Sequence, residues 1–192
     1  TIGNYDYGIF WYLYLDGTIE FEAKLTGTLY LRAITEGEPT PYGSLVAPGV
    51  NGMVHEHYFN IRLDMSVDGD ANTVVEMQAD RVPSGPDNPH GNAHGVSESV
   101  ITSESEGARN AAPKDSRFWK IENRSRSNRL GWHPAYKLMP GPNVAPMHQP
   151  GSPFMRRAGF VEHDLWVTAY DPDELHAPGQ YVNQSECGPG LP

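Results

Sequence analysis

The chain has 192 residues, of which 38% are hydrophobic and 20% are charged, a composition typical of a globular protein and not of a disordered one. Its formal net charge of −10 excludes the basic footprint of a protein that binds nucleic acid or an anionic membrane, and no apolar run approaches the length of a membrane span. The same charge suits a cationic partner. Cys187 is the single cysteine, so no disulfide can form within the chain, which favours a cytoplasmic location.

The first predicted element is a β-hairpin. An aromatic run over residues 10–15 reaches Asp16-Gly17, after which apolar residues at 19, 21 and 23 alternate with charged ones. An Asp-Gly pair between two such runs predicts a type I′ turn, because both central positions of that turn need positive φ. Residues 25–33 are expected to continue as a third strand.

The rest of the chain also favours strands and loops. Residues 58–67 and 73–77 are predicted strands joined by a turn at Asp68-Gly69. Further strands are expected at 96–103, 117–122 and 164–170, a loop at 83–95, one helical turn at 107–112, and irregular chain at 123–153. No segment sustains a helical repeat and no linker divides the chain. The sequence therefore predicts an all-β fold, a large antiparallel β-sandwich with long loops, in which residues 1–192 form one domain truncated at both ends.

The first motif with chemical meaning is Thr1-Ile2-Gly3-Asn4-Tyr5-Asp6-Tyr7. Taken alone, it is typical of a core tyrosine beside a turn. It also resembles the cofactor motif of the copper amine oxidases, in particular their bacterial members, where Thr and two further residues precede Asn-Tyr-Asp/Glu-Tyr. The similarity continues through residues 8–20 and at 128–130, 136–138, 164–168 and 182–184, so it covers nearly the whole chain.

The resemblance implies specific roles for this segment. In that family the enzyme oxidises the middle tyrosine to topaquinone with bound copper and dioxygen, and the quinone carbonyl forms a Schiff base with a primary amine. Tyr5 is therefore the expected topaquinone precursor. Asn4 and Asp6 would flank the ring and restrict its orientation. The remaining residues of the motif would line the substrate and cofactor pocket: Thr1, Ile2, Gly3 and Tyr7.

The second motif is His55-Glu56-His57. Side chains alternate along an extended strand, so both imidazoles are expected on one face, where they can bind copper, zinc or iron. By spacing alone, a pair of surface histidines on a strand is the commoner interpretation. The copper amine oxidases, which this chain resembles, carry a His-X-His pair some fifty residues after the cofactor tyrosine. The resemblance therefore implies that His55 and His57 bind copper. The family's third histidine ligand is expected beyond Pro192, and its general base, an Asp, before Thr1.

Other candidate residues are weaker. The resemblance implies a peripheral calcium-type site at Asp64 and the Met65 carbonyl, but Ser66 stands where a second Asp is expected. An EF-hand starting at Asp64 is excluded, because Val75 occupies the position of the terminal acidic ligand. Cys187 is expected to be inert. The other histidines are predicted to lie in loops: His90, His94, His133, His148, His163 and His176.

The expected function of the parent protein is oxidative deamination of primary amines to aldehyde, ammonia and hydrogen peroxide, with copper, topaquinone and dioxygen, in a homodimer. The chain alone is expected to be inactive without the general base and the third ligand. Two alternatives stay open: a non-catalytic β-sandwich relic, and a His-X-His mononuclear metal oxygenase of the cupin type, which needs no quinone. The visible absorbance of topaquinone in the full-length protein would distinguish the amine-oxidase hypothesis from both alternatives.

Overall fold

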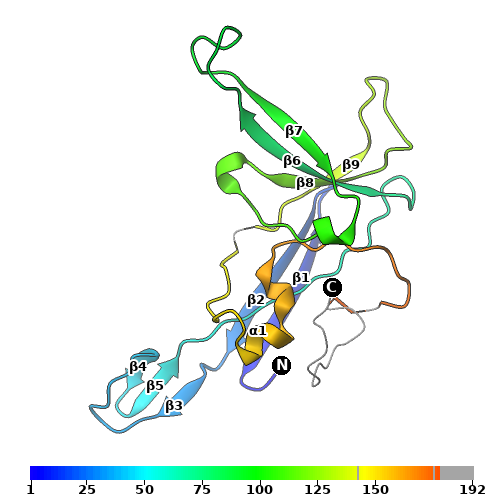
Figure 1. The fold of residues 1–192 in the computed structure, drawn as a ribbon. Helices are drawn as coiled ribbons and strands as arrows, with labels where there is room; N and C mark the ends of the chain where they lie inside the picture. The colour runs from blue at the N-terminus through cyan, green and yellow to red at the C-terminus, as the bar shows by residue number, and fades with distance from the viewer. Residues whose placement is uncertain (142, 175, 178–192) are drawn as a thin grey trace. The chain divides into compact units, whose positions relative to one another are not determined.

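The computed structural model describes residues 1–141, 143–174, 176 and 177, which form antiparallel sheets with few and short helices (Figure 1). The chain divides into two compact units, Thr1–His57 and Tyr58–Pro192. The all-β prediction is confirmed. The prediction that Cys187 is inert and the family resemblance at residues 182–184 lie outside the described residues.

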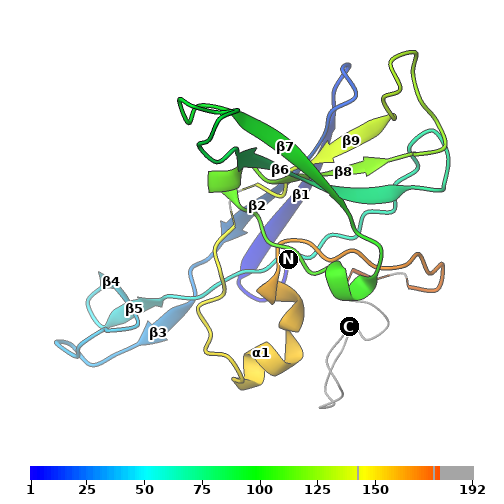
Figure 2. The ribbon, with the colours of Figure 1, turned by 45° about the horizontal axis from the view of Figure 1, so that its top comes forward.

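The first unit opens with a long hairpin of β1 (Tyr5–Leu13) and β2 (Ile19–Gly27) (Figure 2). The register runs from Tyr5 opposite Gly27 to Leu13 opposite Ile19. Because side chains alternate, one face of the hairpin carries Tyr5, Tyr7 and an apolar set that includes Trp11 packed edge-on against Phe21, with ring centroids 5.0 Å apart. The hairpin thus presents both tyrosines of the first motif on the same face.

The turn of this hairpin differs from the type I′ turn that Asp16-Gly17 predicted. The Tyr14 amide bonds the Thr18 carbonyl at 3.0 Å and the Gly17 amide bonds the Tyr14 carbonyl at 3.1 Å, so the loop has three residues, 15–17. Gly17 has φ +87°, whereas Asp16 does not have positive φ. The Asp16 carboxylate instead accepts from the Thr18 amide at 2.9 Å. This is a turn followed by a glycine bulge, which needs positive φ at the glycine alone.

A three-stranded ribbon completes the first unit. Its strands are β3 (Leu31–Ala33), β4 (Gly43–Ala47) and β5 (Val50–Met53), in the order β3-β5-β4. The predicted continuous strand over residues 25–33 is wrong, because the chain leaves the hairpin at Gly27. That glycine has φ +103°, and a Cβ there would lie 2.5 Å from the Asn4 carbonyl oxygen. The break lets residues 31–33 pair with β5 instead of β1.

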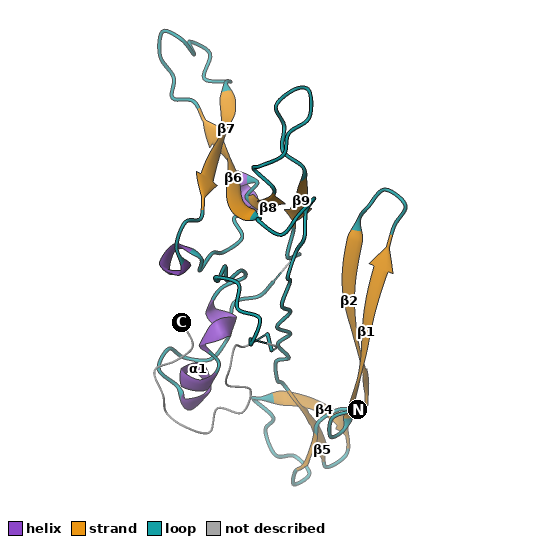
Figure 3. Cartoon of the chain, turned by 90° about the vertical axis from the view of Figure 1, so that its right-hand side faces the viewer, coloured by secondary structure: helices purple, strands orange, loops and turns teal. Residues whose placement is uncertain are grey.

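The second unit is built on one four-stranded sheet in the order β7-β6-β8-β9 (Figure 3). Its strands are β6 (Thr73–Arg81), β7 (His94–Val100), β8 (Phe118–Glu122) and β9 (Ala135–Leu138). The two central strands carry the core of this sheet: Val75 and Met77 on β6, and Trp119 and Ile121 on β8, are buried. Val75 and Trp119 are fully buried. The strands predicted near 73–77, 96–103 and 117–122 are therefore present, whereas β9 falls in a stretch expected to be irregular.

A buried ionic cluster crosses the two central strands. Glu76 of β6, with 7% of its side chain exposed, forms a bidentate ion pair with Arg109, at 2.5 and 2.7 Å. Trp119 of β8 donates its indole N–H to the same carboxylate at 3.0 Å. These bonds, the Arg109 pair first, hold the pKa of Glu76 below its ordinary value against the opposing effect of burial.

The strand predicted over residues 58–67 is wrong, since no strand is assigned between Val54 and Ser66. The side chain of Asn72 takes over the backbone groups at the end of this segment. It accepts from the Val67 amide at 3.2 Å and donates to the Met65 and Gly69 carbonyls, both at 2.9 Å. The alternation of apolar and polar residues over 58–67 is compatible with an extended chain. A strand also needs a neighbouring strand to which its backbone can hydrogen-bond.

Two smaller predictions were also wrong. Residues 164–170 form only an isolated bridge between Leu165 and Arg109, and residues 107–112 form no helical turn. Gly107 permits this close approach, because a Cβ there would lie 2.2 Å from the Val167 carbonyl oxygen. The short helices lie elsewhere: η1 (Glu104–Glu106), η2 (Pro113–Asp115), α1 (Pro153–Arg157) and η3 (Gly159–Glu162). Across the described residues, no helix is long and apolar enough to cross a membrane.

Candidate metal and cofactor site

Tyr5 is held by a tight turn at the start of β1. The amides and carbonyls of Ile2 and Tyr5 bond each other at 2.9 and 3.1 Å, and Gly3 supplies the positive φ, +59°, inside the turn. On the other side, Tyr5 pairs with Gly27 of β2. The backbone of Tyr5 is therefore constrained by two separate elements, which leaves its side chain little choice of face.

The residues that flank Tyr5 bond to the backbone and side chains around it. Asn4 donates its side-chain amide to the Thr28 carbonyl at 2.6 Å, and its own carbonyl accepts from the Thr28 amide at 2.8 Å. The Asp6 carboxylate accepts the hydroxyl proton of Thr1. None of these bonds involves the Tyr5 ring, and the expected effect of Asn4 and Asp6 on its orientation stays a prediction.

His55 and His57 return to the Tyr5 side of the hairpin within the same compact unit. The Tyr5 hydroxyl lies 2.5 Å from His55 Nε2. The ring of His57 meets the Tyr5 ring edge-on, with centroids 4.8 Å apart, and the two imidazole centroids are also 4.8 Å apart. The two imidazoles lie close together, but the strand whose alternation was expected to place them on one face is absent, because residues 54–57 belong to no assigned strand.

Backbone pairing explains why residues fifty positions apart meet. Tyr5 pairs with Gly27, and three residues later the Tyr30 carbonyl accepts from the Met53 amide at 2.9 Å. His55 follows Met53 by two residues, and its ring contacts the Tyr30 ring with centroids 6.1 Å apart. The contact between Tyr5 and His55 thus follows from two hydrogen-bonded pairings.

The tautomer of His55 follows from its backbone partner. Its Nδ1 lies 2.9 Å from the Met53 carbonyl oxygen. A carbonyl only accepts, so Nδ1 carries the ring proton and Nε2 of the neutral ring carries the lone pair. The Tyr5 hydroxyl must then be the donor to Nε2. A metal ligand needs this same arrangement, with the remote nitrogen hydrogen-bonded and the near nitrogen unprotonated.

His57 is held through the same ring atom but by a side chain. Its Nδ1 lies 2.9 Å from the Tyr7 hydroxyl, which leaves Nε2 as the nitrogen that can bind a metal. Two imidazoles with their remote nitrogens engaged suit Cu(II) and other nitrogen-preferring metals. Among the described residues, no group of three or more His, Cys, Asp or Glu side chains could hold a metal by itself, so the pair is an incomplete ligand set.

Sequence reasoning missed two partners in this site. The Met53 carbonyl orients His55, and a backbone carbonyl has no sequence signal because every residue has one. Tyr30 contacts the His55 ring. The sequence shows Tyr30 as an aromatic residue in the segment that follows the hairpin. It does not show that Tyr30 meets His55, because this contact depends on the β3–β5 pairing.

The weaker candidates lie in the second unit. The Met65 carbonyl accepts from Asn72, and Ser66 donates to Asp70 at 3.0 Å, so protein groups already engage this segment beside Asp64. His133 Nδ1 lies 2.6 Å from the Arg126 carbonyl, and His148 stacks on Phe154 with centroids 4.0 Å apart. Neither histidine belongs to a group of three or more His, Cys, Asp or Glu side chains that could hold a metal within the described residues.

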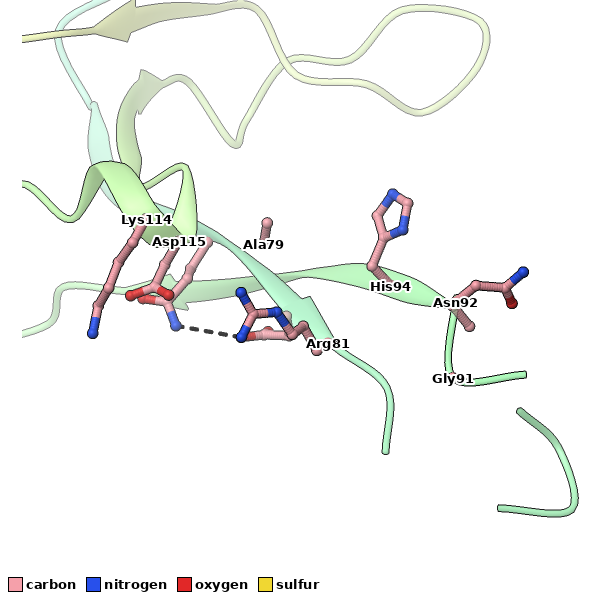
Figure 4. A pocket seen from close by; sticks show the side chains of 10 residues that line it. Ala79, Arg81, Gly91, Asn92, His94, Lys114 and Asp115 are labelled. Carbon is pink, nitrogen blue, oxygen red and sulfur yellow. Dashed lines mark hydrogen bonds between the residues drawn. The ribbon is translucent and has the colours of Figure 1, made fainter. Parts of the chain in front are cut away.

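The second unit also has a surface cavity of about 520 Å³ beside β6 (Figure 4). Its lining includes Arg81, His94, Lys114 and Asp115, which mix both signs of charge. The cavity contains none of the tyrosines or histidines of the two motifs, so it does not belong to the site described above.

Comparison with known proteins gives a consistent result. A family model described as "Copper amine oxidase, enzyme domain" matches residues 1–191. The chain is 46% identical over 192 residues to a histamine oxidase of Arthrobacter globiformis and 42% identical over 196 residues to a peroxisomal copper-containing diamine oxidase of Nicotiana tabacum; each match covers 100% of this chain but only 28% and 25% of the relative.

A solved structure supports the same relationship. The fold is similar to that of a copper-containing benzylamine oxidase from Hansenula polymorpha, with a TM-score of 0.88 and 30% identity, over 96% of this chain and 29% of that one. The chain therefore spans about a quarter of the length of the proteins it matches, and the β-sandwich domains of these relatives agree with the predicted fold class.

Proposed function

The chain belongs to the copper amine oxidase family, and we propose that it carries the quinone-forming tyrosine and two copper ligands of a primary-amine oxidase. The overall reaction converts a primary amine, dioxygen and water into an aldehyde, ammonia and hydrogen peroxide. Tyr5 is the residue oxidised to topaquinone, and His55 and His57 bind copper. The residues around Tyr5 at positions 1–4, 6 and 7 form the wall of the cofactor pocket.

One observation carries the proposal: the tyrosine expected to be oxidised touches the imidazole expected to bind copper, with 2.5 Å between Tyr5 Oη and His55 Nε2. Neither motif required this contact by itself. A structural tyrosine and a pair of surface histidines would have no reason to meet across fifty residues. The contact favours an enzyme over a non-catalytic relic, and over a metal oxygenase in which a tyrosine has no role.

The donor set fits the group that the family implies. His55 and His57 would hold copper through Nε2, since the Nδ1 atom of each ring is hydrogen-bonded elsewhere. When bound, copper together with dioxygen supplies the oxidising power that converts the phenol of Tyr5 into the quinone.

The chain's own residues control one proton in this site. Tyr5 donates its hydroxyl proton to the lone pair of His55 Nε2, the same lone pair that a metal requires. Metal binding at Nε2 and the present hydrogen bond therefore exclude each other, so the Tyr5 hydroxyl must donate its hydrogen bond to another acceptor when Nε2 binds a metal. The turn at Ile2 and the pairing with Gly27 keep the phenol beside the imidazole when this hydrogen bond is broken.

Substrate and assembly belong to the same proposal. A primary amine is cationic at neutral pH, and the net charge of −10 suits its approach. The named activities of the relatives, oxidation of histamine and of diamines, support amines as the substrate class. Family membership also supports a homodimer. A calcium-type site at Asp64 and Met65 stays a prediction.

The test is the formation of the quinone in the full-length protein. The protein is produced without copper, copper is then added in air, and the visible quinone absorbance is followed with time. We expect the band to grow in wild type, and to fail without dioxygen or in His55→Ala. His90→Ala, which changes a histidine of the Pro/Gly-rich loop in the second unit, is the matched control and should behave as wild type.

Three outcomes would contradict the proposal. A quinone band that forms as fast in His55→Ala as in wild type would show that this imidazole is not a copper ligand. Amine-dependent peroxide without any quinone band would favour the metal oxygenase, whereas copper binding with neither band nor turnover would favour the relic.

A further inference from the structure

The two candidate copper ligands are anchored by different kinds of group. His55 Nδ1 bonds a backbone carbonyl, that of Met53, at 2.9 Å. His57 Nδ1 bonds a side chain, the hydroxyl of Tyr7, at the same distance of 2.9 Å. A substitution cannot remove the carbonyl, but a single substitution can remove the hydroxyl. The hydrogen bond at His57 Nδ1 therefore depends on the residue type at position 7.

We propose that Tyr7 is the positioning residue for His57, and that its hydroxyl holds the ring in the tautomer in which Nε2 binds copper by accepting from Nδ1–H. This inference rests on the proposed function. A metal ligand must present an unprotonated nitrogen, so the ring proton of His57 has to be on Nδ1. In that state the Tyr7 oxygen accepts from Nδ1–H and fixes the plane of the ring.

The chemistry of a hydroxyl makes this role different from that of the Met53 carbonyl. A hydroxyl can donate as well as accept. If Tyr7 donates to Nδ1, the ring proton of neutral His57 is on Nε2 and the ring cannot bind a metal. If Tyr7 accepts, the ring is ready for the metal. The Met53 carbonyl therefore fixes the tautomer of the first ligand. The Tyr7 hydroxyl can bond either tautomer of the second, and it holds the metal-binding one by accepting from Nδ1–H.

The ring and the hydroxyl of Tyr7 can be separated experimentally. Tyr7 lies in β1 opposite Leu25, its side chain is half-buried, and its ring centroid is 6.1 Å from that of Tyr5. Phenylalanine keeps this ring packing and removes only the oxygen that bonds His57. Tyr12 offers a matched control, because it is a half-buried tyrosine in the same strand whose hydroxyl bonds Glu22 at 2.7 Å.

The experiment measures copper binding directly in the full-length protein, before any quinone forms. Copper affinity is determined by competition with a chelator under anaerobic conditions for wild type, Tyr7→Phe and Tyr12→Phe. Loss of an outer-shell partner of a metal-binding histidine typically weakens metal binding by about 10- to 100-fold. We expect a loss of this size in Tyr7→Phe and no loss in Tyr12→Phe.

A spectroscopic measurement separates positioning from general damage. Electron spin-echo envelope modulation of the Cu(II) form detects the remote nitrogen of each bound imidazole, and its quadrupole coupling depends on that nitrogen's hydrogen bond. In Tyr7→Phe, we expect the coupling of one imidazole to change while that of the carbonyl-anchored one does not. If Tyr7→Phe does not fold, 3-fluorotyrosine at position 7 weakens the hydroxyl as an acceptor without changing the packing, and it should shift the same signal.

The outcomes distinguish this inference from the proposed function. Unchanged affinity and unchanged couplings in Tyr7→Phe would overturn the role of Tyr7 and leave the proposed function intact. Weaker binding with unchanged couplings would also overturn it, since the cause would then be structural. Copper binding of normal affinity in His57→Ala would instead contradict the proposed function itself.

Discussion

Replacing the buried carboxylate of Glu76 by an amide should destabilise the second unit selectively. In Glu76→Gln the shape is kept, but the bidentate ion pair with Arg109 and the 3.3 Å ion pair with Arg117 are lost. Breaking a buried pair from one side costs about 3–5 kcal/mol. Arg109 keeps 35% of its side chain exposed, so water can compensate part of the loss, and the new amide oxygen can still accept from Trp119. We therefore expect about 3 kcal/mol, the lower end of that range.

Hydrogen exchange of the full-length protein can measure this loss locally. The backbone amides of β6 and β8 open through the unit that contains Glu76, so their protection reports its stability. A loss of about 3 kcal/mol corresponds to roughly 100-fold faster exchange. The matched control is Glu98→Gln on the neighbouring strand β7. Glu98 pairs with Lys120 at 3.3 Å but has 45% of its side chain exposed, and such surface pairs contribute less than about 1 kcal/mol.

Acidification provides an independent check with a defined sign. The folded-state pKa of Glu76 lies below the ordinary value of 4.5, chiefly because of its bond to Arg109. Its contribution is therefore present above the unfolded-state pKa and is lost as pH falls through the folded-state pKa. The gap between wild type and Glu76→Gln should narrow on acidification below about pH 4.5. Equal exchange in Glu76→Gln and Glu98→Gln, or a gap that does not narrow, would refute the reasoning.

Two further predictions concern the first unit. Tyr5→Phe should bind copper at wild-type levels by metal analysis but show no quinone absorbance, because the phenol oxygen is missing; normal turnover by this variant would exclude Tyr5 as the cofactor. Gly27→Ala should slow or prevent quinone formation, because its φ of +103° and a Cβ 2.5 Å from the Asn4 carbonyl oppose any side chain. Wild-type kinetics of the quinone band in Gly27→Ala would show that the pairing with Tyr5 tolerates displacement.

The hairpin could be predicted from the sequence because two independent signals agreed. Alternation indicated the strands, and Asp16-Gly17 indicated the connection. The turn type was missed because a glycine with positive φ serves both a type I′ turn and a bulged three-residue loop. The register decides between them, and it places Leu13 opposite Ile19. Register depends on the packing of both faces, which a local pattern does not report.

The prediction of residues 58–67 failed for a related reason. Alternation shows that a segment can be extended, but it does not show where its backbone hydrogen bonds go. Here the side chain of Asn72 satisfies the groups at Met65 and Val67. An asparagine that captures backbone groups from five and seven residues away leaves no periodic signal.

The candidate site was found because resemblance supplied both motifs, and the structure adds the physical reason that they meet. Gly27 pairs with Tyr5, and Tyr30 pairs with Met53 just before His55. Residues 34–49 lie outside these two pairings, so their length does not determine whether the phenol reaches the imidazole. The short connections do, at 28–29 and at Val54. A shift of one residue at Val54 would exchange His55 and His57 for Glu56 on the face that meets Tyr5. The constraint is therefore the pairing, which by itself does not require a spacing of fifty residues.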